Sequence, residues 1–177
     1  MKRFIFLVPV ILLLCVSAQA QETPAWDVSG GYSFLRANLN ASGGSFDLNG
    51  GYVSTTENLN NWFGGRLEIN AYNGSVSGTN VSAQTFTYGP VFSYRKFDRI
   101  TPFANVQVGA VHAGVGYLGI SEGAFKFAMS AGGGVDLNLN RRFAIRAQGA
   151  YLMTRFLDLR QDNLQFSSGL VVHFGRK

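Results

Sequence analysis

Charged side chains are rare in this sequence, so the few that recur at alternating positions are the first candidates for chemistry. Six of them would share the inner face of extended segments: Arg66, Glu68, Asp136, Arg146, His173 and Asp27. Asp136 and Arg146 flank a polar turn at 138–142, at a spacing that places them nearly opposite each other on adjacent antiparallel strands. An ion pair is expected there. Arg66 and Glu68 lie two residues apart and therefore share one face of a strand.

This polar cluster has two open interpretations. It is either a plug of paired charges, because an unpaired charge is costly to bury, or a gate whose pairs rearrange to pass ions. His173 would approach Asp27 if the last strand paired with the first.

We expect no catalytic, cofactor-binding or metal-binding residues. The sequence has only two histidines, and His112 is followed by Ala113-Gly114-Val115 rather than by a serine motif. No ligand cluster has metal-site spacing, and no glycine-rich stretch has the strand–helix context of a phosphate loop.

The N-terminus predicts a secretory signal peptide. Met1-Lys2-Arg3 is basic, residues 4–16 are almost continuously apolar, and Ala18-Gln19-Ala20 fits a small-x-small cleavage site. We expect residues 1–20 to be removed, leaving a mature domain of 21–177; an uncleaved anchor is the alternative. Cys15 lies within the signal, so the mature chain has no thiol for disulfides or catalysis.

The composition disfavours both a soluble enzyme and a helical membrane protein. There are 22 Gly, 15 Phe and 7 Tyr but only 14% charged residues, where a soluble domain has about a quarter. Loss of Lys2 and Arg3 leaves 13 basic and 10 acidic residues, a net charge of +3. That excess is too small to indicate nucleic acid binding. No long apolar run follows residue 20.

Apolar and small or polar residues alternate with a period of two throughout the mature sequence, which indicates β-strands. Eight segments follow this pattern: 26–36, 45–55, 62–73, 83–95, 102–112, 125–137, 143–154 and 163–174. Each is near the ~9–11 residues that a tilted strand needs to cross a bilayer. Val53 breaks the alternation of Phe46, Leu48, Gly50 and Tyr52, which suggests a bulge, and Pro90 needs a bulge or a strand end. The fold class is therefore all-β: an eight-stranded antiparallel up-and-down transmembrane β-barrel.

The connections and the aromatic residues predict how this barrel sits in a membrane. Connections at 56–61, 96–101 and 138–142 are short, whereas 37–44, 74–82, 113–124 and 157–162 are generally longer, so both termini would be periplasmic. Aromatic residues near the strand ends would form two girdles: Trp26, Tyr94, Phe143 and Phe174 at the inner rim, and Phe34, Phe86, Phe125, Tyr151 and Phe166 at the outer rim. A soluble lipocalin-like barrel is disfavoured because the non-aromatic face has too few charges to be solvated.

Several short motifs occur in an order that resembles a known family. They are Asn60-Asn61-Trp62-Phe63-Gly64, Tyr88-Gly89-Pro90, Thr101-Pro102-Phe103-Ala104, Gly132-Gly133-Gly134-Val135-Asp136 and Tyr151-Leu152-Met153-Thr154-Arg155-Phe156. The chain resembles the small outer-membrane β-barrel domains related to the transmembrane domain of OmpA and to OmpX. Gly169, Val172 and Phe174 are similar to the family's C-terminal insertion signal, although Gly175-Arg176-Lys177 follow the usually terminal aromatic residue.

The resemblance implies an integral outer-membrane protein. It defines the location better than the activity, because the roles of family members vary. We expect a monomer with a structural and surface role. The partners would be outer-membrane lipid, the barrel-insertion machinery and periplasmic chaperones. Alternatives are a narrow pore gated by Arg66, Glu68, Asp136 and Arg146, an adhesin or ligand binder acting through loop 113–124, and a lipid A-modifying enzyme.

Overall fold

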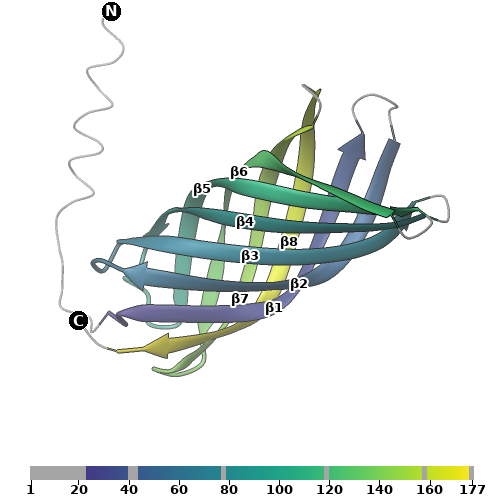
Figure 1. Cartoon of the computed structure of the whole chain (residues 1–177). Coiled ribbons are helices and arrows are strands. Elements are labelled where there is room, and N and C mark those ends of the chain that lie inside the picture. Colours follow the sequence, from purple (N-terminus) through teal and green to yellow (C-terminus); the bar gives the residue numbers. More distant parts are fainter. Residues whose placement is uncertain (1–22, 40–43, 77–78, 118–119, 157–158, 176–177) are drawn as a thin grey trace, which may run out of the picture.

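The computed structural model is a closed β-barrel, described for residues 23–39, 44–76, 79–117, 120–156 and 159–175. The expected signal peptide lies outside these residues. The strands are β1 (Trp26–Leu39), β2 (Gly44–Asn58), β3 (Phe63–Val76), β4 (Thr79–Ser93), β5 (Ile100–Tyr117), β6 (Ile120–Asn138), β7 (Phe143–Phe156) and β8 (Leu159–Phe174), all antiparallel to their neighbours (Figure 1). The expected all-β, eight-stranded barrel is confirmed. No helix that could cross a membrane is found in the described part of the chain.

The barrel closes where β1 pairs with β8. This seam runs in register from Trp26 opposite Phe174 to Arg36 opposite Leu164. β1 therefore begins, and β8 ends, at the same rim, which we call the terminal end (Figure 1). At the opposite rim, the hairpin end, the chain turns between β1 and β2, β3 and β4, β5 and β6, and β7 and β8.

The two faces of the wall follow the predicted alternation. In β3, Arg66, Glu68 and Asn70 are buried inside the barrel, whereas Leu67 between them is 41% exposed on the outside. This is the reverse of a soluble barrel, in which apolar side chains fill the interior and charges cover the surface. An apolar exterior is stable only against lipid, because apolar surface in water is unfavourable.

The bulge expected in the second strand does not occur. β2 keeps an unbroken register with both β1 and β3. Leu48 and Tyr52 point inward and Val53 points outward in regular alternation. The prediction was wrong because it assumed that the bulky residues of this strand face lipid, whereas they fill the lumen.

Pro90 also lies inside a strand without changing its register. The ladder between β4 and β5 pairs Tyr88 with Val108 and resumes at Val91 with Asn105, so the gap within it is limited to Gly89 and Pro90. Pro90 remains paired with Gly65 of β3. Neither the bulge nor the strand end that Pro90 seemed to need is present, because the gap in one ladder is enough to accommodate the missing donor.

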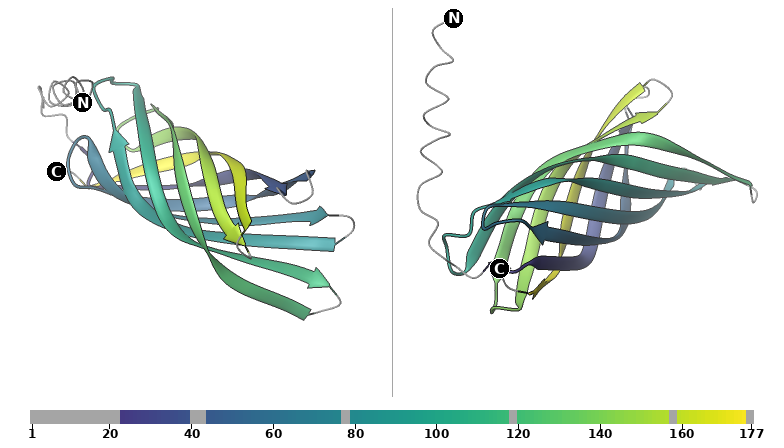
Figure 2. Two further views of the ribbon diagram at one scale, coloured as in Figure 1. Left: turned by 90° about the horizontal axis from the view of Figure 1, so that it is seen from above. Right: turned by 60° about the vertical axis from the view of Figure 1, so that its left-hand side comes forward.

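The connections at the hairpin end are much shorter than the sequence predicted. Strand pairing continues to Leu39–Gly44, Val76–Thr79, Tyr117–Ile120 and Phe156–Leu159, so most residues assigned to long loops are strand. Glycine, serine and asparagine have low strand propensity, but pairing across a hairpin satisfies backbone groups that would otherwise lack partners. The β5–β6 hairpin projects well beyond the rest of the barrel (Figure 2), since β6 pairs with β7 only from Ala128 onward.

Two turns at the terminal end have the same sequence pattern and the same hydrogen bonds. Residues 58–63 and 138–143 both read Asn-Leu-Asn-x-x-Phe. In the first turn the side-chain oxygen of Asn60 accepts hydrogen bonds from the backbone N–H groups of residues 62 and 63, and Asn140 does the same for residues 142 and 143. We call these the twin turns. Their shape depends on the asparagine and not on the two variable residues.

Close strand contacts at glycine give a first testable prediction. A Cβ on Gly109 would lie 1.8 Å from the carbonyl oxygen of Phe86, whereas a Cβ on Gly149 would be no nearer than 3.4 Å to any neighbouring atom. We expect Gly109→Ala to lower the free energy of unfolding by ~1–3 kcal/mol, because the backbone must shift. Gly149→Ala is the matched control and should change it little. Urea unfolding of protein folded into lipid vesicles measures both; equal stability would contradict the contact.

Candidate functional site

The centre of the lumen contains a buried, bidentate ion pair. Arg146 of β7 lies opposite Asp136 of β6 in the strand register. Its Nε and Nη2 donate to the two carboxylate oxygens of Asp136 at 2.7 and 2.8 Å, and its Nη1 donates to Ser29 of β1 at 3.3 Å. Both charged side chains are almost fully buried. The ion pair expected from the sequence is present, in the geometry that best offsets the cost of desolvation.

The second central arginine, Arg66, has no carboxylate within ion-pair distance in the described part of the chain. Its Nε donates to Thr56 at 3.0 Å and its Nη1 to Gln148 at 3.4 Å. The guanidinium carbons of Arg66 and Arg146 lie 4.5 and 4.8 Å from the centre of the Phe103 ring. One buried aromatic ring thus contacts both cations, which is a favourable arrangement in a desolvated site. The alternation of Phe103 with Asn105 would have placed this ring in the lumen, but the sequence analysis did not use it.

The Glu68 carboxylate is hydrogen-bonded by amides rather than by Arg66. Its carboxylate accepts hydrogen bonds from Gln165 at 3.0 Å, Gln148 at 3.1 Å and Asn70 at 3.2 Å. Among the described residues Glu68 forms no ion pair. The expectation that lumen charges are paired with each other therefore holds for Asp136 and Arg146 but not for Glu68 and Arg66, whose polar neighbours provide the hydrogen bonds instead.

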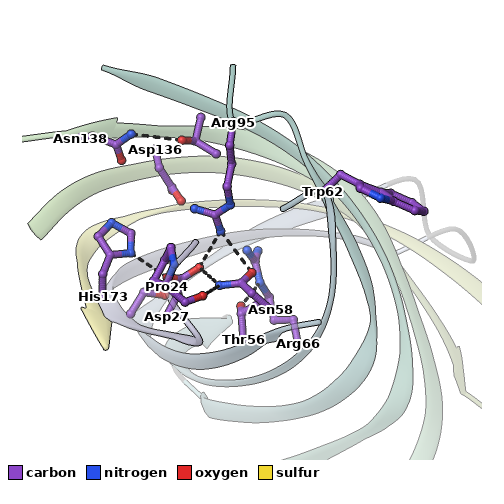
Figure 3. A network of polar contacts seen from close by, with 12 residues as sticks. Pro24, Asp27, Thr56, Asn58, Trp62, Arg66, Arg95, Asp136, Asn138 and His173 are labelled. Atoms are coloured by element: carbon purple, nitrogen blue, oxygen red, sulfur yellow. Dashed lines mark hydrogen bonds and ion pairs between the residues drawn. The ribbon is translucent and has the colours of Figure 1, made fainter. Parts of the chain in front are cut away.

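A second polar network closes the terminal end of the lumen. Asp27 accepts hydrogen bonds from Arg95 Nη2 at 3.0 Å and Asn58 Nδ2 at 2.9 Å, and its other oxygen lies 2.7 Å from His173 Nδ1. Arg95 also donates to Asn58 at 3.1 Å. Figure 3 shows these side chains converging on Asp27 from different parts of the wall. The expected approach of His173 to Asp27 is present, and it follows from the closure of β8 on β1.

An apolar layer fills the lumen toward the hairpin end. One buried residue from each of β1 to β7 contributes to it: Leu35, Leu48, Tyr72, Ala83, Val111, Ala128 and Leu152. The Tyr72 hydroxyl joins it to the polar region through Ser33 at 2.9 Å. The sequence predicted only polar and small residues inside. This layer could not be predicted because an inward leucine or valine looks the same in sequence as one that faces lipid.

The three residues of the proposed insertion signal lie on β8 near the terminal end. Phe174 is 51% exposed on the outer wall, and Gly169 lies beside Gly31 at the seam. A Cβ on Gly169 would be 2.3 Å from the carbonyl oxygen of Gly30, so a larger residue would disturb closure. Val172 pairs with Val28. Their role in insertion stays a prediction.

Aromatic side chains cover the outer wall near its ends. Trp26, Tyr94, Phe143 and Phe174 are exposed at the terminal end, and Phe86, Tyr151 and Phe166 nearer the hairpin end. The sequence analysis missed a cluster at the first twin turn, where Trp62 and Phe92 stack with ring centres 6.1 Å apart and both contact Phe63. In Figure 3 the Trp62 side chain points away from the lumen.

The remaining candidate, His112, does not join the lumen sites. It lies in β5, paired with Gln84 and Phe125, and its parity in the strand places it on the outer wall. In the described part of the chain no three histidine, cysteine or acidic side chains are grouped so that they could hold a metal ion.

Comparisons with known proteins point to one family. The family model for the outer membrane protein β-barrel domain matches residues 6–174. Among solved structures, the chain is similar to Neisserial surface protein A, with a TM-score of 0.75 and 13% identity, covering 85% of this chain and 97% of that one. It is also similar to Ail, the attachment invasion locus protein of Yersinia pestis, with a TM-score of 0.61, 19% identity, and 84% and 99% coverage. OprG from Pseudomonas aeruginosa matches with a TM-score of 0.56, 9% identity, and 89% and 99% coverage.

At these identities the structural matches establish the fold alone. The comparison with curated protein sequences finds no match.

The central ion pair gives a second prediction. Asp136→Leu or Arg146→Met should each lower the free energy of unfolding by about 3–5 kcal/mol, because each leaves a buried charge without its partner. The double variant should lose less unfolding free energy than the sum of the losses in the two single variants. The exposed pair of Arg36 and Asp47, at 3.1 Å, is the control, for which we expect a coupling of about 0–1 kcal/mol. Urea unfolding in vesicles measures the wild type, the two single variants and the double variant for each pair. Additive effects at 136 and 146 would contradict the pairing.

Proposed function

We propose that this chain, which belongs to the outer membrane protein β-barrel domain family, is a structural barrel with an occluded lumen. The location of the family is the outer membrane. It would stabilise the membrane and carry four short hairpin tips at one surface. We further propose that it acts as a monomer, with membrane lipid as its main partner.

The observation that carries this proposal is the filling of the lumen at three successive levels. The Asp27 network lies at the terminal end, the Arg66, Glu68 and Arg146 cluster in the middle, and the apolar layer toward the hairpin end. An eight-stranded barrel has an interior just wide enough for its own side chains. Ions passing through would have to break charge-assisted hydrogen bonds and then cross an apolar layer, which disfavours permanent conduction.

The exterior supports the role of lipid as partner. Exposed apolar residues occur on every strand, among them Val28, Val53, Leu67, Val106 and Ile145. Aromatic side chains near the two ends suit the boundary between hydrocarbon and headgroups. We propose that the hairpin end, where the β5–β6 hairpin projects beyond the barrel (Figure 2), faces outward, because the longer excursions of this class of barrel are extracellular. The terminal end would then face the periplasm. Delivery through a signal peptide, periplasmic chaperones and the barrel-insertion machinery is part of the same proposal.

Catalysis is not part of the proposal. His173 is engaged by Asp27, and among the described residues no hydroxyl group is hydrogen-bonded to its imidazole. The Asp27 carboxylate is further bound by Arg95 and Asn58, so the pair forms part of a structural network rather than a free base.

Conductance in planar bilayers tests occlusion directly. The wild-type barrel should show no stable stepwise current, because all three levels are filled. A variant with Arg66→Ala, Tyr72→Ala and Arg95→Ala removes one large side chain from each of the three levels and should conduct. Ala71→Gly, a small change on the outer wall, is the control. Steady wild-type steps whose size changes with Arg66→Gln would instead favour the charged-gate pore.

A deletion strain tests the structural role. Cells without the protein should become more sensitive to detergent, since a stabilising component of the membrane is lost. Expression of the wild-type chain should restore resistance, and so should a chain whose segment 113–124 is replaced by a short turn. If that replacement abolishes a surface-binding activity while the deletion leaves detergent resistance unchanged, the adhesin interpretation is favoured.

A further inference from the structure

A large cavity opens at the terminal end, outside the three filled levels. Its volume is about 910 Å³, within the range of roughly 300–1,000 Å³ that is usual for ligand pockets. It is lined by the turn after β4, the second twin turn and the ends of the chain, and its charged and titratable lining residues are Arg95, Asp98, Arg99, Arg141, Arg142 and His173. We call this cavity the terminal bowl.

The terminal bowl is strongly basic. Four of its lining residues are arginines, Arg95, Arg99, Arg141 and Arg142, and one is an aspartate, Asp98, which leaves a formal net charge of +3 with His173 neutral. The whole chain has a formal net charge of only +5. Positively charged side chains gathered around a concave surface repel each other. A concave wall of low dielectric focuses their field on a bound anion.

Arg95 links the bowl to the network below it. Its Nη2 donates to Asp27 and Asn58, so the guanidinium is fixed in place at the floor. Its Nε is buried and has no hydrogen-bond partner among the residues that the structure describes. A buried donor without an acceptor is unfavourable. The charge of Arg95 is balanced by Asp27 at 3.0 Å, so the net positive charge of the bowl comes from Arg99, Arg141 and Arg142 against Asp98.

The arginines of the twin turn are not needed for the turn itself. Asn140 caps the backbone of residues 142 and 143, as Asn60 does in the first twin turn. At the two variable positions the first turn has Asn61 and Trp62, with Trp62 54% exposed on the outer wall. The second turn has Arg141 and Arg142, which line the bowl. The same scaffold therefore carries a membrane-facing ring on one side and a pair of cations on the other.

We propose that the terminal bowl binds a ligand with two or more phosphate groups. Guanidinium groups match phosphate oxygens with paired hydrogen bonds, and arginines from two different turns around one cavity can engage more than one phosphate. The ligand is either a soluble oligophosphate or the headgroup of an anionic phospholipid. Both sources offer the same chemistry.

Titration calorimetry with tripolyphosphate tests the soluble form. The full chain, purified from membranes in dodecyl maltoside and shown to be folded by its heat-shifted gel mobility, should bind the probe. The variant with Arg141→Asn and Arg142→Trp copies the first twin turn and should keep the fold, but it should bind about ten-fold or more weakly because two charged donors are lost. Arg36→Gln removes an exposed arginine at the hairpin end and should leave binding unchanged.

A second arm distinguishes the two sources. The titration is repeated in nanodiscs of phosphatidylcholine alone and in nanodiscs that also contain phosphatidylglycerol. Weaker tripolyphosphate binding in the anionic discs, seen for wild type and absent for the twin-turn variant, identifies the lipid headgroup as the occupant. Equal binding in both discs identifies a soluble oligophosphate. The proposal is overturned if the wild type binds no tripolyphosphate, or if the twin-turn variant binds it as well as wild type does.

Discussion

Every backbone N–H and C=O group within the hydrocarbon layer must find its partner inside the protein, because lipid offers none. For a chain of strands this requires a closed ladder, and here the pairing of β1 with β8 completes it. With eight strands the enclosed space is narrow. Closure therefore decides the interior as well as the wall, since every inward side chain must be satisfied by another inward side chain.

The lumen meets this requirement in four different ways. Asp136 and Arg146 neutralise each other with a bidentate pair, whereas Glu68 is surrounded by amide donors. Arg66 is stabilised by hydroxyl and amide oxygens and by the Phe103 ring. Toward the hairpin end the interior becomes apolar and needs no partners at all. Each level adds an obstacle to ions, and together they favour a barrel whose stability matters more than its permeability.

The terminal end combines a closed floor with an open, basic rim. Asp27 of β1 binds side chains from β2, β8 and the turn after β4, which ties the rim together. Above it, a turn whose backbone is held by Asn140 is free to vary at two positions. In such a turn one residue holds the backbone and two others are exposed. The exposed residues can therefore form a binding surface without loss of stability.

The sequence by itself determined the class of fold, the eight strands, the seam and the position of most inward charges, because a period of two needs only local information. From that parity and antiparallel neighbours, the pairs of Asp136 with Arg146 and of Asp27 with His173 could be predicted. The tertiary structure alone decided that Leu48 and Tyr52 face inward, that Glu68 is held by amides, and that the hairpins extend almost to their tips. The arginines of the terminal bowl, from turns some forty residues apart, were also brought together only by closure. The physical reason is that alternation fixes which residues share a face, whereas the level at which side chains from different strands meet depends on the register around the whole barrel.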